Sequence, residues 1–309
     1  MGREKSAEYV GAKGNLMPPM KMSRNRSLLL CLLAYLVAAV AAAGVCRLSG
    51  QGSPVLAAAL ADLAATVVVF AFSLGLDNSS MYDPYWSVAP FPIGLYWLVR
   101  FSAGLTPRQI VLLALVLVWA VRLTANWLRR WRGLADEDWR YADYRRLGAA
   151  YWPVSFLGFH LFPTILVFLG CVSLVPALTE GSRSTGALDL LALVVTATAV
   201  AIESTADKQL RRFLASPRTP GQILDTGLWA FSRHPNYFGE VLFWWGVYLF
   251  GLAANPFWWW TIIGPIAITA LFLGVSVPMM DRRMLARHPG YAAHIGIRSG
   301  LIPLPGRRF

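Results

Sequence analysis

Long apolar runs separated by short basic blocks constrain this chain more than any other feature. The candidate membrane spans are residues 27–46, 55–76, 88–99, 109–128, 154–178, 186–202, 240–252 and 257–277. A bilayer core takes about 20 apolar residues per helix, so the third and seventh runs are short. The hydrophobic share is 56% of 309 residues, above that of an ordinary soluble domain. The pattern predicts an all-α fold, a polytopic transmembrane helical bundle of about seven to eight spans.

The distribution of charge sets the expected topology. Twenty-eight Lys and Arg against 16 Asp and Glu give a net charge of +12. The basic residues gather in the N-terminus, 129–146, 208–233 and 282–308. If all four blocks are cytoplasmic, the chain must cross the membrane an even number of times between one block and the next. Three other runs lie between the N-terminus and 129–146, so the Pro-containing run 88–99 must cross as well. We therefore expect about eight crossings with both termini cytoplasmic. A re-entrant loop at 88–99 is the alternative. Basic residues confined to such blocks disfavour nucleic acid as a partner.

The cysteines and the first apolar run suggest no disulfide framework, metal site or cleaved leader. Cys31, Cys46 and Cys171 lie in or beside apolar runs, without paired spacing or a nearby histidine. They are expected to be packing residues. The run 27–46 is longer than the apolar core of most signal peptides, so we interpret it as a signal anchor or first span.

Charged groups at span ends are candidate site residues, because burying charge in lipid is costly. Glu203, Asp207 and Arg211 follow one another at four-residue spacing and share a helix face. Arg122 and Asn126 lie one turn apart in an otherwise apolar helix. Arg122 is expected to face protein or a bound anion. The alternatives are a solvated helix end for the first group and snorkelling for the second.

Residues 232–240 read Ser-Arg-His-Pro-Asn-Tyr-Phe-Gly-Glu and stand at the entry of a very apolar helix. Pro235 suits the first helical turn and directs Asn236 and Glu240 into the bundle. Arg233 and the free N–H groups of that turn are good phosphate ligands. Buried Asn and Glu side chains suit an amide or a ribose. The alternative places the arginine among lipid headgroups.

The segment 77–90 combines carboxylates with aromatic side chains where two spans meet. Tyr82 and Asp83 could hold a carbonyl group and supply a proton. An interfacial aromatic belt explains the same composition. Further along the chain, the Pro and Gly residues of 216–229 predict a fixed turn structure.

Three motifs, at residues 207–213, 225–229 and 232–240, together resemble the steroid 5α-reductase-like family. The likeness is to its broad bacterial and protist branch of membrane oxidoreductases, and it covers about residues 77–305. Members of the family are helical bundles that bind NADPH from the cytosolic side. They reduce a carbon–carbon double bond, often conjugated to a ketone, in a steroid, sterol or polyprenol.

The resemblance implies that Asn236 and Glu240 contact the cofactor. The further cofactor-binding candidates are Arg233, His234, Tyr237, Asp207, Arg212, Arg122, Asn126 and Arg298. In the steroid-reducing branch a glutamate and a tyrosine from the N-terminal half hold the ketone. No such pair aligns here residue by residue, so Tyr82 and Asp83 are the catalytic candidates.

The chain then divides into a basic cytoplasmic tail (1–26), N-terminal spans on the substrate side (27–106) and a catalytic and cofactor-binding region (107–309). One alternative is an S-adenosylmethionine-dependent isoprenylcysteine or phospholipid methyltransferase, which shares an Arg-His-Pro-x-Tyr turn. Another is a non-catalytic membrane protein with a degenerate pocket. Asn236, Glu240 and 225–229 favour the reductase. The expected partners are a lipid-like substrate and membrane lipids. The expected location is the endoplasmic reticulum if the chain is eukaryotic, and the inner membrane if it is bacterial.

Overall fold

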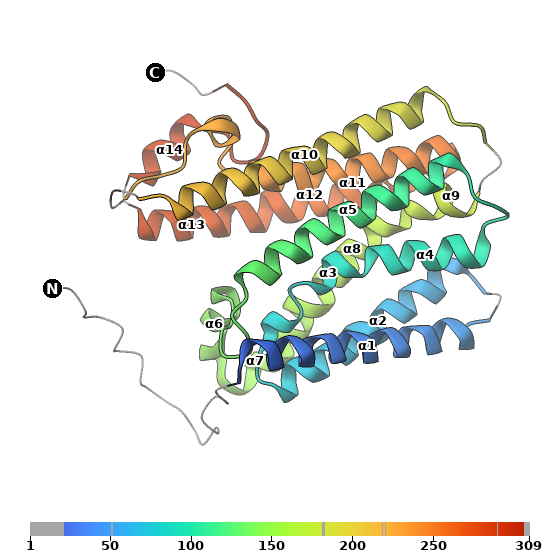
Figure 1. The fold of residues 1–309 in the computed structure, drawn as a ribbon, viewed down its shortest axis with the longest axis horizontal. Coiled ribbons are helices and arrows are strands. Elements are labelled where there is room, and N and C mark those ends of the chain that lie inside the picture. The colour runs from blue at the N-terminus through green and yellow to red at the C-terminus, as the bar shows by residue number, and fades with distance from the viewer. Residues whose placement is uncertain are drawn as a thin grey trace.

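Helices provide the regular structure of the chain (Figure 1). The computed structural model describes residues 22–50, 52–180, 183–217, 219, 221–288 and 290–305. Within these ranges no strand forms, and Ser232 and Ser299 make an isolated bridge. Seven helices there are long and apolar enough to cross a membrane. The predicted polytopic all-α bundle is confirmed. Most of the predicted basic tail, residues 1–21, lies outside the described residues.

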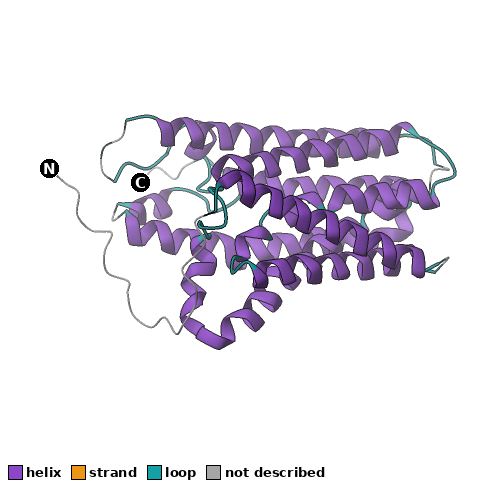
Figure 2. Cartoon of the chain, turned by 60° about the horizontal axis from the view of Figure 1, so that its bottom comes forward, coloured by secondary structure: helices purple, strands orange, loops and turns teal. Residues whose placement is uncertain are grey.

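The α-helices follow one another along the chain as a series of long and short segments. Their bounds are α1 Arg24–Leu48, α2 Pro54–Gly75, α3 Tyr85–Val88, α4 Pro90–Phe101, α5 Pro107–Arg130, α6 Trp139–Tyr144, α7 Tyr151–Val154, α8 Phe162–Val172, α9 Leu174–Thr179, α10 Ala187–Ala215, α11 Pro235–Ala254, α12 Ile263–Leu271, α13 Val277–Arg287 and α14 Tyr291–Ile297. Two π-helical turns, Ser155–Leu161 and Phe272–Ser276, join α7 to α8 and α12 to α13. Figure 2 shows the long helices running side by side along one axis, with loops at both ends.

Proline and capping residues explain where several helices begin. Pro54, Pro107 and Pro235 stand in the first turns of α2, α5 and α11, where a missing N–H costs no helical hydrogen bond. At the start of α5, Thr106 and Gln109 form a capping box, with the Thr106 N–H donating to Gln109 Oε1 at 2.7 Å. The predicted start of a helix at Pro235 is confirmed.

Two helices are longer than their apolar runs predicted. The apolar run 186–202 ends before α10, which continues to Ala215, and the apolar run 240–252 begins after the start of α11 at Pro235. Apolar runs mark the part of a helix that faces lipid or core. The helix itself continues because its polar residues, Glu203 and Asp207, pair with Arg122 of α5.

The Pro-containing run also passes along the bundle. The Asn78 N–H donates to Ser73 O at 2.9 Å near the end of α2, and the Trp97 indole donates to Pro54 O at 3.0 Å at its start. Residues 78–97 therefore return along the length of α2, mainly through α3 and α4. With the seven long helices this makes eight passes. Figure 1 accordingly shows the start of α1 and the helix α14 at the same end of the bundle.

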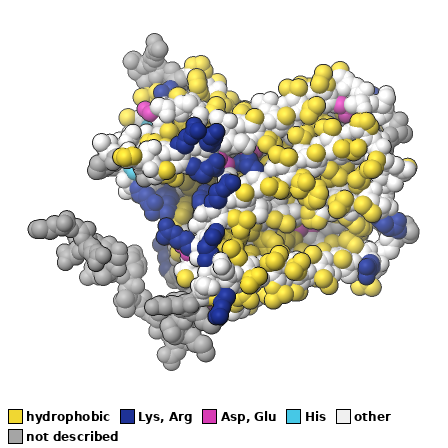
Figure 3. Space-filling model, viewed as in Figure 1, with side chains coloured by type: hydrophobic (Ala, Val, Ile, Leu, Met, Phe, Trp, Pro, Cys, Tyr) yellow, Lys and Arg dark blue, Asp and Glu magenta, His cyan; other side chains and the backbone are white. Residues whose placement is uncertain are grey.

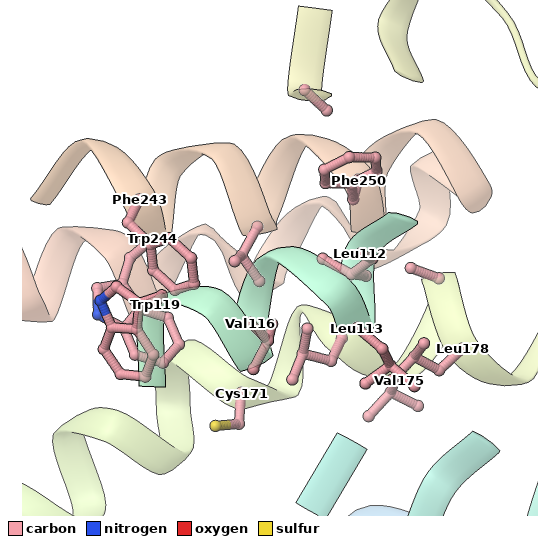
Figure 4. Packing of buried hydrophobic residues seen from close by; sticks show 14 of the residues in the cluster. Leu112, Leu113, Val116, Trp119, Cys171, Val175, Leu178, Phe243, Trp244 and Phe250 are labelled. Carbon is pink, nitrogen blue, oxygen red and sulfur yellow. The ribbon is translucent and has the colours of Figure 1, made fainter. Parts of the chain in front are cut away.

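The largest apolar core lies where α5 meets α9 and α11 (Figure 4). Trp119 and Phe243 stack there with ring centroids 4.7 Å apart and planes 7° from parallel. The thiol of Cys171 is free and buried in the same core. This core supports the polar residues that follow Trp119 on α5.

Helices α10 and α11 approach closely at two glycines of α11. A Cβ atom added to Gly246 would overlap Thr196, and one added to Gly239 would overlap Glu203. Both neighbours belong to α10, so glycine at these positions lets the two backbones come together.

We expect Gly246→Val to lower the free energy of unfolding by about 1–3 kcal/mol, the usual cost of overpacking. The added methyl groups must push α10 away at Thr196. Thermal unfolding of the purified protein in detergent measures the loss. Gly44→Val is the matched control, because no atom lies within 4 Å of a Cβ at Gly44 of α1. Equal melting temperatures for the two variants would contradict this packing.

Candidate functional site

Glu240 lies one turn into α11 and is held by two indoles. Its Oε2 accepts a hydrogen bond from Trp119 and its Oε1 accepts one from Trp244, both at 3.0 Å. The side chain is buried, so these bonds replace the water that a carboxylate would otherwise bind. The carboxylate is thereby fixed at the contact between α5 and α11.

Arg122 of α5 points into the protein, among three carboxylates. It pairs with Glu203, lies 2.6 Å from Asp207 Oδ2, and approaches Glu240 Oε2 at 3.9 Å. The side chain of Arg122 is 12% exposed. Snorkelling toward water, the alternative considered for this arginine, is therefore not what the structure shows. The four-residue spacing predicted that Glu203 and Asp207 would hold Arg211 of their own helix. In the structure the arginine that pairs with both carboxylates is Arg122 of α5.

Asn126 connects the same cluster to the surface. Its amide donates to Asp207 Oδ2 at 2.5 Å, and its Oδ1 accepts from Arg211 at 3.0 Å and from Arg129 at 3.2 Å. The structure thus brings Arg122 and Asn126, one turn apart on α5, together with Asp207 of α10, 81 residues after Asn126.

Besides Arg122 Nη2, which pairs with Glu203, three buried polar atoms in this region have no hydrogen-bond partner among the described residues. They are Arg122 Nε, Glu203 Oε1 and Asn236 Oδ1. Asn236 lies one helical turn before Glu240 on α11, and Gly239 packs against the Glu203 side chain. Buried polar groups are rarely left unpaired, so these atoms form a candidate site for a polar ligand.

Arg233 and His234 meet a different partner, Asp281 of α13. Arg233 Nη2 lies 2.7 Å from Asp281 Oδ2, and the His234 ring and the Tyr291 hydroxyl lie 3.1 and 3.0 Å from Oδ1. Arg233 also donates to the carbonyl of Arg298 at 2.5 Å. The two residues therefore hold the C-terminal segment against the turn that begins α11.

The other predicted cofactor residues surround these two groups. Tyr237 stacks on His234 with ring centroids 5.1 Å apart. Arg298 meets Arg233 through its backbone, and its own side chain is half-buried. Arg212 is exposed on the last turn of α10. The predicted set thus falls into a group around Arg122 and a group around Asp281.

Tyr82 and Asp83 lie in the N-terminal half but face different neighbours. The Tyr82 hydroxyl is 2.7 Å from Thr164 Oγ1, inside the bundle. Asp83 Oδ1 accepts from the Tyr141 hydroxyl at 2.5 Å and from Arg140 at 3.3 Å. Burial raises the pKa of Asp83 to about 6, against the opposing charge of Arg140.

A buried acid and tyrosine pair stands beside Tyr82, and the sequence analysis did not find it. The Tyr85 hydroxyl donates to Asp62 Oδ1 at 2.6 Å, and both residues are buried. Tyr82 stacks on Tyr85 with ring centroids 5.2 Å apart. Asp62 is the lone charged residue of the apolar run 55–76, and a charge in a span is itself a signal of function.

The segment α3 places this pair next to the Glu240 group. Trp86 follows Tyr85 in the chain and packs edge-on against Trp119, with ring centroids 6.2 Å apart. Ser87 and Thr124 join α3 to α5 at 3.0 Å. Trp86 thus packs both against the cluster that holds Tyr82 and Tyr85 and against the core that holds Trp119.

Basic side chains gather at the end of the bundle where these polar residues lie. Figure 3 shows Lys and Arg side chains along a hollow at that end, while hydrophobic side chains cover much of the rest of the visible face. Arg129, Arg211 and Arg212 are exposed residues of the helix ends in this region. A soluble anionic molecule would be attracted to this end.

The fold and the site define a multi-pass membrane protein with a buried polar centre that hydrogen bonds of Asn126 connect to exposed arginines at one end. Residues 69–295 match the family described as protein of unknown function (DUF1295), which is steroid 5α-reductase-like, and the chain belongs to that family. It is 26% identical over 254 residues to an uncharacterized protein of Schizosaccharomyces pombe, covering 74% of this chain and 73% of that protein. No solved structure matches the chain significantly.

Proposed function

We propose that the chain is an NADPH-dependent membrane oxidoreductase. Its substrate would be a lipid-like steroid, sterol or polyprenoid, and the reaction would reduce a carbon–carbon double bond conjugated to a ketone. The observation that carries the proposal is the buried Asp62–Tyr85 pair beside the Glu240 group. It supplies an acid and a tyrosine from the N-terminal half, the combination that holds the ketone in the steroid-reducing branch of the family.

The unpaired atoms near Arg122 suit a nicotinamide cofactor. Asn236 Oδ1 and Glu203 Oε1 are free acceptors and Arg122 Nε is a free donor, which together match an amide or a ribose. Arg212, Arg129 and Arg211 would meet the phosphates at the basic end. Arg233 and His234 would act through Asp281 by holding the turn that carries Asn236.

The chemistry of such a reduction matches the N-terminal pair. When bound, NADPH would supply the hydride. Negative charge then develops on the ketone oxygen, and the protein must offer a hydrogen-bond donor there. The Tyr85 hydroxyl, which donates to Asp62 Oδ1 in the structure, would be such a donor once the Asp62 carboxyl is protonated and donates to Tyr85 in turn. An O–H group of this pair could also protonate the α-carbon. Tyr82, stacked on Tyr85, would shape the same site.

The charge distribution supports an orientation with both termini cytoplasmic, because the basic end of the bundle would then face the cytoplasm. This places the cofactor residues within reach of soluble NADPH. The membrane would be the endoplasmic reticulum in a eukaryote or the inner membrane in a bacterium.

A thermal-shift comparison of NADPH with S-adenosylmethionine tests the cofactor. We expect NADPH to raise the melting temperature of the purified protein and S-adenosylmethionine to leave it unchanged. Asn236→Ala should weaken NADPH binding by about 1–3 kcal/mol, because a buried polar contact is lost. Asn25→Ala, an exposed position on α1, should bind as the wild type does.

Stabilisation by S-adenosylmethionine alone would contradict the reductase proposal and indicate a methyltransferase. Stabilisation by NADPH without its oxidation in the presence of a lipid extract would indicate a degenerate pocket.

A further inference from the structure

We propose that Trp127 and Trp131, at the end of α5, bind an anionic phospholipid together with Arg26 and Arg132. This site is separate from the polar residues around Arg122 and does not depend on the proposed reaction. The lipid's ester carbonyl would accept from the indoles, and its phosphate would meet the arginines.

The indole N–H groups of Trp127 and Trp131 are hydrogen-bond donors that have no acceptor among the described residues. Trp127 and Trp131 stack with ring centroids 4.6 Å apart and planes 24° from parallel. The Nε1 atom of each is buried and has no hydrogen-bond partner among the described residues. Buried indole N–H groups usually find an acceptor, so two unpaired neighbours point to one that lies outside the described residues.

The indoles pack in an apolar cluster of the described residues. Trp131 packs with Cys31, Ala34 and Met81, and Trp127 lies against the same cluster. The end of α5 is held to α1 by Arg24, which donates to Trp131 O at 3.0 Å. A ligand reaching the indoles would therefore lie along α1.

The charge beside the indoles is positive. Residues 22–30 and 127–134 contain five arginines and no acidic residue. Arg26 and Arg132 are exposed, and no acidic side chain of the described ranges pairs with either. Asp83, which lies near Arg130, is already held by Arg140 and Tyr141. An anion is the ligand that these free arginines favour.

The arginines, indoles and leucines follow one another along the bundle axis in the same order as the phosphate, ester carbonyl and acyl chain of a phospholipid. Arg26 is in the first turn of α1, and Arg132 lies two residues after the end of α5. Trp127 lies one turn deeper than Trp131. Deeper on α1, the exposed side chains are leucines, with Leu29 65% and Leu32 55% exposed. Phosphate, ester carbonyl and acyl chain would meet arginine, indole and leucine in turn.

Native mass spectrometry of the detergent-purified full chain, titrated with lipid, tests the site. Wild-type protein should bind dioleoyl phosphatidylglycerol more tightly than dioleoyl phosphatidylcholine. The double variant Trp127→Phe/Trp131→Phe keeps an aromatic ring at each position but loses both indole N–H donors. It should bind phosphatidylglycerol on the order of tenfold more weakly. Arg26→Gln/Arg132→Gln should abolish the preference for the anionic lipid.

Trp259→Phe is the matched control, because this indole is 64% exposed and lies in the 3₁₀ helix Pro256–Ile262 between α11 and α12. It should bind phosphatidylglycerol as the wild type does. Melting temperatures confirm that each variant is folded. Unchanged affinity in the double tryptophan variant would overturn the proposal. Wild-type binding without a headgroup preference would do the same. So would stabilisation by inorganic phosphate equal to that by phosphatidylglycerol, because the indoles would then have no ester carbonyl to bind.

Discussion

Asp62→Asn and Tyr85→Phe are each expected to lower kcat for reduction of an enone by about 10²–10⁴-fold, the range for loss of a proton-transferring group. Affinity for NADPH should stay unchanged, because neither residue belongs to the group around Arg122. Single-turnover oxidation of NADPH with an enone lipid measures the first quantity, and direct titration of NADPH measures the second.

The physical reason lies in the single hydrogen bond between the two side chains. The Tyr85 hydroxyl donates to Asp62 Oδ1 at 2.6 Å in a buried setting. Phenylalanine removes the hydroxyl that would face the ketone oxygen. Asparagine keeps the shape of Asp62 but removes its carboxyl group, so the tyrosine loses the protonated partner that would free its O–H for the ketone oxygen and then replace its proton.

Two further tyrosine variants make this prediction specific. Tyr82→Phe loses the bond to Thr164 but leaves the Asp62–Tyr85 pair intact, and Tyr144→Phe changes an exposed hydroxyl. We expect a small effect of the first on kcat and none of the second. Full activity in Tyr85→Phe with a large loss in Tyr82→Phe would assign the role to Tyr82, the residue that the sequence predicted.

Arg122→Met is expected to destabilise the protein by about 3–5 kcal/mol, the usual cost of removing one partner from a buried ion pair. Glu203, Asp207 and Glu240 would remain near one another without their shared cation. The same variant should lose stabilisation by NADPH. Denaturant or thermal unfolding in detergent gives the first effect, and cofactor titration gives the second.

Compensating substitutions separate folding from binding at this site. Neutralising the partners in Arg122→Met/Glu203→Gln/Asp207→Asn should restore much of the stability, because the uncompensated charges are gone. It should not restore NADPH binding. Arg47→Met, at an exposed end of α1, is the matched control and should change neither property. Wild-type stability in Arg122→Met would show that the three carboxylates do not need this arginine.

The charge pattern predicted the path of the chain well, but residues 78–97 show the limit of hydropathy. The run 88–99 is too short and too rich in proline to be identified as a span by itself. Counting basic blocks required it to cross, and the contacts of Asn78 and Trp97 with the two ends of α2 show that it does return along that helix. Charge constrained the topology because it limits which loops share a side.

The candidate site was predictable only where helix periodicity brings residues together. Glu203, Asp207 and Arg211 share a face of α10, as do Arg122 and Asn126 on α5, and the structure joins these two faces. Arg233 has no such local partner. Its position in the motif suggested a phosphate ligand, whereas the structure pairs it with Asp281, 48 residues later in the chain.

The sequence by itself determined the membrane bundle, its number of passes and the end at which polar residues gather, because apolar length and charge placement act locally along the chain. Only the tertiary structure decided that Tyr85 meets Asp62, that Arg122 neutralises Glu203 and Asp207, and that two indoles of α5 face α1 without acceptors. These contacts depend on which helix faces pack together. That packing is set by shape and close approach, as at Gly239 and Gly246, and spacing along one helix does not encode it.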